Sequence, residues 1–84
     1  MNKRPICEIA DEIRTVWINK DGEPNVNYAA EPYLAAMQDL NTVDEMYGLD
    51  TGISVVLYFL SNAAPFRGED ARRIKTELKE LCNV

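Results

Sequence analysis

The most apolar stretch of the sequence reads ISVVLYFL and occupies residues 53–60. Seven of its eight residues are apolar or aromatic, so the segment is either a largely buried helix or a central strand. Its β-branched residues favour a strand, whereas its flanks favour a helix. Asp50 or Thr51 can cap a first turn, and Pro65 is the first residue after the stretch that must end or bend a helix. A segment of about 13 residues has the length of a helix, and we predict a core helix here.

Amphipathic patterns on both sides of this stretch predict helices that cover it. Apolar residues recur at helical spacing over residues 6–17, after Pro5, and again over residues 71–82. Residues 32–40 are rich in alanine and unbranched side chains, which have high helix propensity. Thr42 and Glu45 have the spacing of a capping box, which predicts a further short helix that ends at Gly48.

These elements together predict an all-α fold, a compact single-domain bundle of four to five short helices over residues 1–84. The central stretch would lie between the two terminal helices, so aspartate in place of Leu57 is expected to unfold the protein. An α+β alternative, with a small hairpin around residues 16–28, stays open because Asp21-Gly22 can form a tight turn. A chain of 84 residues makes one domain with a small core.

The two cysteines, Cys7 and Cys82, fall on the apolar faces of the first and last predicted helices. We expect reduced core thiols, with a disulfide between these helices as the alternative. The longest apolar run is far shorter than the roughly 20 residues that cross a membrane. The start of the chain also lacks the apolar segment of a signal peptide. We therefore expect a protein of the bacterial host cytoplasm that makes no contact with a membrane.

The sequence contains few of the residue patterns that enzymes use. It has no histidine, so the usual base of a nucleophilic triad is absent, and the four glycines are too isolated to form a phosphate loop. Adjacent carboxylates such as Asp11 and Glu12 point about 100° apart on a helix and do not converge. We predict no enzymatic activity, no catalytic residue, no metal site and no cofactor.

The charge is distributed unevenly along the chain. The net charge is −5, yet no lysine or arginine lies between Lys20 and Arg67, and each flank carries one net positive charge. The acidic residues of this stretch are Asp21, Glu23, Glu31, Asp39, Asp44, Glu45 and Asp50. They either form a solvated face that keeps a small protein soluble or bind a partner with a basic surface. The sign of the charge disfavours direct nucleic-acid binding.

Three tyrosines lie in or beside this acidic stretch: Tyr28, Tyr33 and Tyr47. Tyrosine provides contact area at little entropic cost, so these side chains are a second set of candidate contact residues. The alternative, which we favour, is that they cap a small core and keep their hydroxyl groups at the surface.

Three segments of the chain resemble small uncharacterised proteins of phages and mobile elements. They read PYLAAM at residues 32–37, SVVLYFLSNA at residues 54–63 and FRGEDARRIK at residues 66–75. The resemblance implies a genomic context and carries no known catalytic motif. Small acidic products of such elements often bind host proteins, and some anti-CRISPR proteins are similar in being acidic mimics of DNA. The present chain departs from such mimics in its nearly neutral terminal helices.

Charge and resemblance together predict a phage-type acidic inhibitory protein that acts stoichiometrically as a monomer. Its partner would be a host nucleic-acid-binding complex with a basic surface, such as a subunit of a CRISPR effector, and the seven carboxylates would form the contact face. One alternative is a helical structural or assembly protein that self-associates. Another is a small regulator that contacts DNA through Arg67, Arg72, Arg73 and Lys75.

Overall fold

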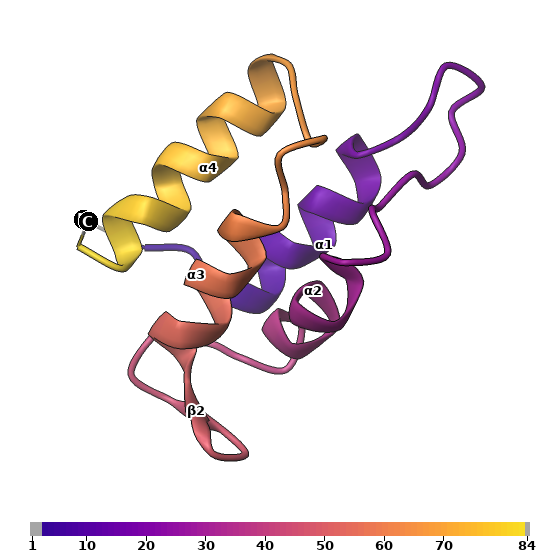
Figure 1. Ribbon diagram of the computed structural model, residues 1–84. Helices are drawn as coiled ribbons and strands as arrows, with labels where there is room; N and C mark the ends of the chain where they lie inside the picture. The colour runs from indigo at the N-terminus through magenta and orange to yellow at the C-terminus, as the bar shows by residue number, and fades with distance from the viewer. Residues whose placement is uncertain (1–2, 84) are drawn as a thin grey trace.

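The computed structural model describes residues 3–83 of the chain. This part contains four helices and one short hairpin (Figure 1). The elements are α1 (Ile6–Val16), α2 (Glu31–Met37), β1 (Met46–Tyr47), β2 (Asp50–Thr51), α3 (Gly52–Ser61) and α4 (Glu69–Leu81). The prediction of a small, mostly helical domain is confirmed. The two strands lie outside residues 16–28, where only an isolated bridge between Ile18 and Pro24 forms. None of the four helices is long and apolar enough to cross a membrane.

The apolar stretch at residues 53–60 is helical, as predicted, and forms most of α3. Thr51 is its N-cap, and the Thr51 hydroxyl oxygen accepts a hydrogen bond from the Ser54 N–H at 3.1 Å. Val56 and Phe59 are fully buried. The expectation that aspartate in place of Leu57 unfolds the protein assumed that this side chain is buried. This assumption was wrong, because Leu57 is 36% exposed.

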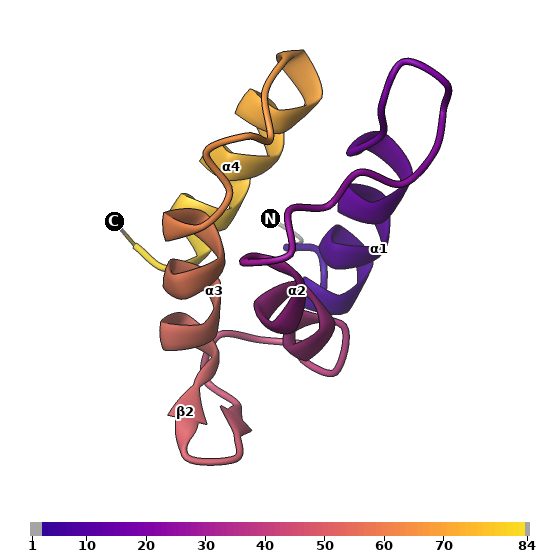
Figure 2. The same ribbon diagram turned by 45° about the vertical axis from the view of Figure 1, so that its right-hand side comes forward.

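The packing around α3 differs in part from the predicted arrangement. The helix that covers α3 most closely is α2, whereas α4 lies against both α3 and α1 (Figure 2). Aromatic contacts close the core beyond the end of α1. The Trp17 ring stacks on Phe66 with 4.8 Å between ring centroids and meets the edge of Phe59 at 6.3 Å. The central helix is therefore buried by α2 and α4 rather than between the two terminal helices.

Residues 42–45 form a turn, so the predicted short helix at this place was wrong. Part of the capping-box chemistry survives, because the Glu45 carboxylate accepts a hydrogen bond from the Asn41 N–H at 2.8 Å. Gly48 follows with φ of +62°, and the chain reverses over Gly48 and Leu49 between the paired residues Tyr47 and Asp50. A two-residue loop with glycine first is a favoured hairpin connection, and here it prevails over the helix signal.

Ion pairs join the start of the chain to α1 and α4. Arg4 contacts Glu12 at 2.8 Å and Glu77 at 2.6 Å, and Arg73 contacts Glu12 at 2.7 Å and Asp70 at 3.1 Å. The hydrogen bond from Arg73, together with the one from Arg4, lowers the pKa of the Glu12 carboxyl. Arg4 and Arg73 thus connect the start of the chain, α1 and α4 through Glu12 and Glu77.

Cys7 and Cys82 are both free thiols in the structure. Cys82 is buried, and this burial raises the pKa of its thiol. Cys7 is half-buried, and its thiol lies 3.5 Å from the side-chain oxygen of Asn41.

Candidate interaction surface

The fold separates the seven predicted contact carboxylates. Asp44, Glu45 and Asp50 lie on or beside the β1–β2 hairpin at one end of the molecule (Figure 1). Asp21 and Glu23 lie in the loop after α1, and both ribbon views show this loop at the opposite end (Figure 2). The other two, Glu31 and Asp39, lie at the start of α2 and just after its end. The seven residues therefore do not gather on a single face.

Glu31 forms an ion pair within the protein, and Asp21 and Glu23 lie in a loop that is held through their backbone N–H groups. Glu31 binds Arg14 through two hydrogen bonds of 2.6 and 3.0 Å, and this pairing raises the pKa of Arg14. In the loop after α1, the side-chain oxygen of Asn19 accepts hydrogen bonds from the N–H groups of Asp21 and Glu23. Glu31 therefore acts first as the ion-pair partner that joins α2 to α1.

The hairpin is unusual because it exposes apolar side chains. All four strand positions are exposed, and Met46 pairs with Thr51 while Tyr47 pairs with Asp50. The side chain of Leu49, at the turn, is 98% exposed, that of Met46 is 59% exposed and that of Tyr47 is 42% exposed. We call Met46, Tyr47 and Leu49, together with Asp44, Glu45 and Asp50, the hairpin surface.

The hairpin surface is firmly attached to the N-terminus of α3. The Gly52 N–H donates to the Glu45 carbonyl oxygen at 2.7 Å, and the Ile53 N–H donates to the Val43 carbonyl oxygen at 3.1 Å. These bonds, with the Thr51 cap, use the N–H groups that begin the helix, so this helix end offers no free donors to an anion. A Cβ atom on Gly52 would lie 2.8 Å from the Thr42 carbonyl oxygen, so only glycine permits this close backbone approach.

Exposed apolar side chains continue on α3. Leu57 and Tyr58 are 36% and 50% exposed, and the Tyr58 ring contacts Tyr33 with 5.5 Å between centroids. Five of the seven large hydrophobic side chains that residues 3–83 expose belong to the hairpin or to α3. The other two are Ile18 and Tyr28. Sequence reasoning named Tyr47 as a candidate contact residue but favoured a core-capping role for it, and it missed Met46 and Leu49.

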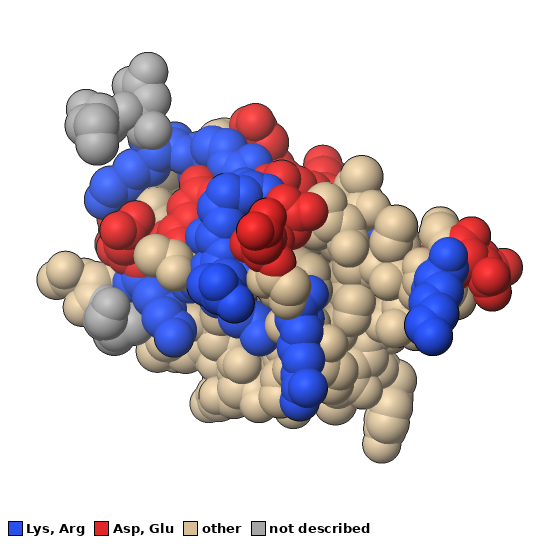
Figure 3. All heavy atoms as spheres, turned by 90° about the horizontal axis from the view of Figure 1, so that it is seen from above, with Lys and Arg blue, Asp and Glu red and all other residues tan. Residues whose placement is uncertain are grey.

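Lysine and arginine side chains gather away from the hairpin. Figure 3 shows the side of the molecule that lies opposite the hairpin. Many lysine and arginine side chains lie on this side, with carboxylates among them. Lys3 and Arg4 line a pocket of about 190 Å³ together with Asp44 of the hairpin surface. Arg4 is held there by Glu12 and Glu77. The hairpin itself carries carboxylates and apolar groups but no lysine or arginine, and Lys3 lies in the pocket beside Asp44.

The four basic residues of the DNA-contacting alternative have different surroundings. Arg73 is paired with Glu12 and Asp70, and Lys75 donates from its ammonium group to the carbonyl oxygens of Ala63 and Phe66 at 2.8 and 2.7 Å. Burial lowers the pKa of Lys75. Arg67 and Arg72 are exposed.

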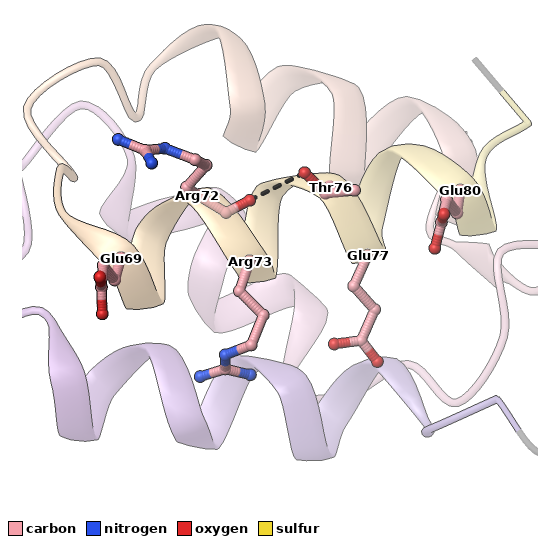
Figure 4. A pocket seen from close by; sticks show the side chains of 6 residues that line it. All are labelled: Glu69, Arg72, Arg73, Thr76, Glu77 and Glu80. Atoms are coloured by element: carbon pink, nitrogen blue, oxygen red, sulfur yellow. Dashed lines mark hydrogen bonds between the residues drawn. The ribbon is translucent and has the colours of Figure 1, made fainter.

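Basic and acidic side chains are mixed along one side of α4. Figure 4 shows Arg73 and Glu77 pointing the same way from α4, toward α1, and both line a shallow depression. Glu69 and Glu80 line the same depression. This mixture of charges along α4 does not form a continuous basic patch.

Comparison of the chain with protein-family models, with curated proteins and with solved structures finds no match. Within residues 3–83, cysteine and carboxylate side chains do not gather in a group of three or more that could hold a metal ion. The hairpin surface is the feature of the described chain that most resembles an interaction site.

Proposed function

We propose that this protein is an acidic binding protein that acts stoichiometrically by occupying a basic surface of another protein. One observation carries the proposal: the hairpin surface presents exposed Met46, Tyr47 and Leu49 beside carboxylates. It lies within a stretch of sequence that has no lysine or arginine. Of the basic groups of α1 and α4, Arg14 pairs with Glu31, and Arg73 pairs with Glu12 and Asp70.

A solvated acidic face would explain the carboxylates but not the apolar side chains among them. Single exposed hydrophobic residues are common on protein surfaces and need no explanation. Here three such residues fall within four positions of a hairpin that projects from the fold (Figure 1). Methionine and tyrosine are also enriched in protein interfaces, whereas isolated acidic solubilising surfaces do not need them.

We propose a host target for this binding because three segments of the chain resemble proteins of phages and mobile elements, although no family model, curated protein or solved structure matches the chain. A nucleic-acid-binding complex, such as a CRISPR effector subunit in the bacterial cytoplasm, has a basic groove that suits carboxylates in place of phosphates. Occupation of that groove would exclude the nucleic acid and would require no catalytic residue in this chain. Binding of this kind would be fast and sensitive to salt.

Charge reversal at the hairpin tests the proposal. Asp44→Lys with Asp50→Lys changes two exposed carboxylates, whereas Glu45 is left intact because it holds the Asn41 N–H. We expect wild-type protein to capture a basic protein from host lysate and the double variant to lose most of that capture at low salt. Asp21→Lys with Glu23→Lys is the matched control at the other end of the molecule. Equal capture by wild type and the hairpin variant would contradict the proposal.

The same exposed apolar side chains favour self-association as a second candidate function. Light scattering over a range of concentrations separates the two, because the binding protein is expected to be a monomer. A stable oligomer that does not dissociate on dilution would favour the assembly protein instead.

A further inference from the structure

We propose that the hairpin surface docks onto a cationic amphipathic segment of a partner protein, with Met46, Tyr47 and Leu49 as apolar anchors. Asp44 and Asp50 then pair with lysine or arginine side chains beside the apolar face of that segment. The inference rests on the proposed function and deepens it, because it assigns the affinity to apolar contact as well as to charge.

The exposure of the three side chains identifies them as the anchors. The Leu49 side chain, at 98% exposure, has almost no contact with the rest of its own protein, and the Met46 side chain retains 59% exposure. Neither therefore contributes much to the core, and both can be buried completely by a partner. A few apolar or aromatic side chains at the centre of an interface commonly provide most of its affinity.

The hairpin is also preorganised for contact. Its base is fixed to α3 by the hydrogen bonds from the Gly52 and Ile53 N–H groups, and its turn is fixed by the positive φ of Gly48. A partner that binds such a surface loses little affinity to the ordering of a loop. Strands of two residues are too short to extend a sheet in the partner, so the contact is made by side chains.

Charge complementarity selects the occupant. The hairpin has carboxylates at Asp44, Glu45 and Asp50 beside its apolar residues and no lysine or arginine of its own, although Lys3 and Arg4 line a pocket with Asp44. A second copy of this chain would bring the same carboxylates together, and an anionic lipid surface or a nucleic acid would repel them. The apolar face of a cationic amphipathic segment can contact Met46, Tyr47 and Leu49, and the lysines or arginines beside that face can pair with Asp44 and Asp50.

The test uses a synthetic peptide of lysine and leucine at amphipathic helical spacing as the probe, added to the full isotope-labelled chain in an NMR titration. We expect the largest amide shifts at residues 46–51. We also expect that a peptide with serine in place of each leucine binds at least about tenfold more weakly, since it lacks the apolar face.

A double variant, Met46→Ser with Leu49→Ser, should also bind the lysine–leucine peptide about tenfold more weakly than wild type does. Both side chains are exposed, so its thermal midpoint should stay that of the wild type. Tyr28→Ser is the matched control, because Tyr28 is 88% exposed but lies outside the hairpin. The affinity of this variant for the lysine–leucine peptide should equal that of the wild type.

The possible outcomes distinguish this inference from the proposed function. If the serine variant binds as tightly as wild type while Asp44→Lys with Asp50→Lys weakens binding, apolar anchoring is overturned and acidic binding stands. If neither peptide binds to the wild type, this inference fails, whereas the proposed function is decided by the capture of a basic protein from host lysate. Shifts centred on another surface, binding to phosphatidylglycerol vesicles through residues 46–51, or a wild-type dimer that the serine variant abolishes would each overturn the choice of occupant.

Discussion

Gly52→Ala tests the attachment of the hairpin to α3, on which the hairpin surface depends. In an ordinary helix this change stabilises the protein by roughly 0.5–1 kcal/mol, because alanine loses less backbone entropy than glycine. In this structure the added Cβ would lie 2.8 Å from both the Thr42 carbonyl oxygen and the Val43 Cα. These are backbone atoms, so the segment at residues 42–43 must move away from the helix.

That movement strains two hydrogen bonds, from the Gly52 N–H to Glu45 and from the Ile53 N–H to Val43. Each is worth about 1 kcal/mol net, and overpacking of a buried position costs about 1–3 kcal/mol. After subtraction of the propensity gain, we expect Gly52→Ala to lower the free energy of unfolding by about 2 kcal/mol. For a domain of this size that corresponds to a fall in Tm of about 8–16 °C.

Thermal and urea unfolding followed by circular dichroism measure this change. Ser61→Ala is the control, since Ser61 is an exposed residue at the other end of α3, and its effect should stay within about 0.5 kcal/mol. A Gly52→Ala protein that is as stable as wild type or more stable, with unchanged amide signals for residues 43–51, would refute the described attachment.

Three further predictions follow from individual side chains. The depressed pKa of Glu12 means that its pairing with Arg73 stabilises the fold above the ordinary glutamate pKa and is lost as the pH falls below about 4.3. The Tm difference between wild type and Glu12→Gln should therefore shrink from pH 7 to pH 3, and a constant difference would argue against the pairing. Lys75→Met removes the two hydrogen bonds that the Lys75 ammonium donates to the carbonyl oxygens of Ala63 and Phe66. Urea unfolding should show a free energy of unfolding about 1–3 kcal/mol lower than that of the wild type. An unchanged free energy of unfolding would show that these hydrogen bonds do not stabilise the fold. Leu57→Asp should remain folded with a Tm near that of wild type, because the side chain reaches the surface, and an unfolded spectrum would place Leu57 in the core after all.

The helices could be predicted because their signals are local and strong. The regular apolar spacing predicted α1 and α4, and the choice of helix for residues 53–60 followed from a possible cap at Asp50 or Thr51 and from the length of the segment. The hairpin could not be predicted, because the capping box at Thr42 and Glu45 and the turn at Gly48 favour different structures. In the structure, the N–H groups of Gly52 and Ile53 donate hydrogen bonds to the carbonyl oxygens of Glu45 and Val43 and hold the hairpin in place. No local sequence pattern indicates these hydrogen bonds.

The sequence also could not show which carboxylates are free. Glu31 and Asp44 look alike in a stretch without basic residues, yet Arg14 reaches Glu31 from α1. Leu57 and Val56 are neighbours in an all-apolar helix, and only the packing of α2 and α4 decides which of them is buried. Periodicity carries no information about orientation when every position of a helix is apolar.

The NMR titration of the isotope-labelled chain with the lysine–leucine peptide tests the central claim most directly. Binding through the hairpin surface predicts that the amides of residues 46–51 shift most and that the Met46→Ser, Leu49→Ser variant loses those shifts at the same peptide concentration. Largest shifts in the loop at Asp21 and Glu23, or around Arg67 and Arg72, would contradict it.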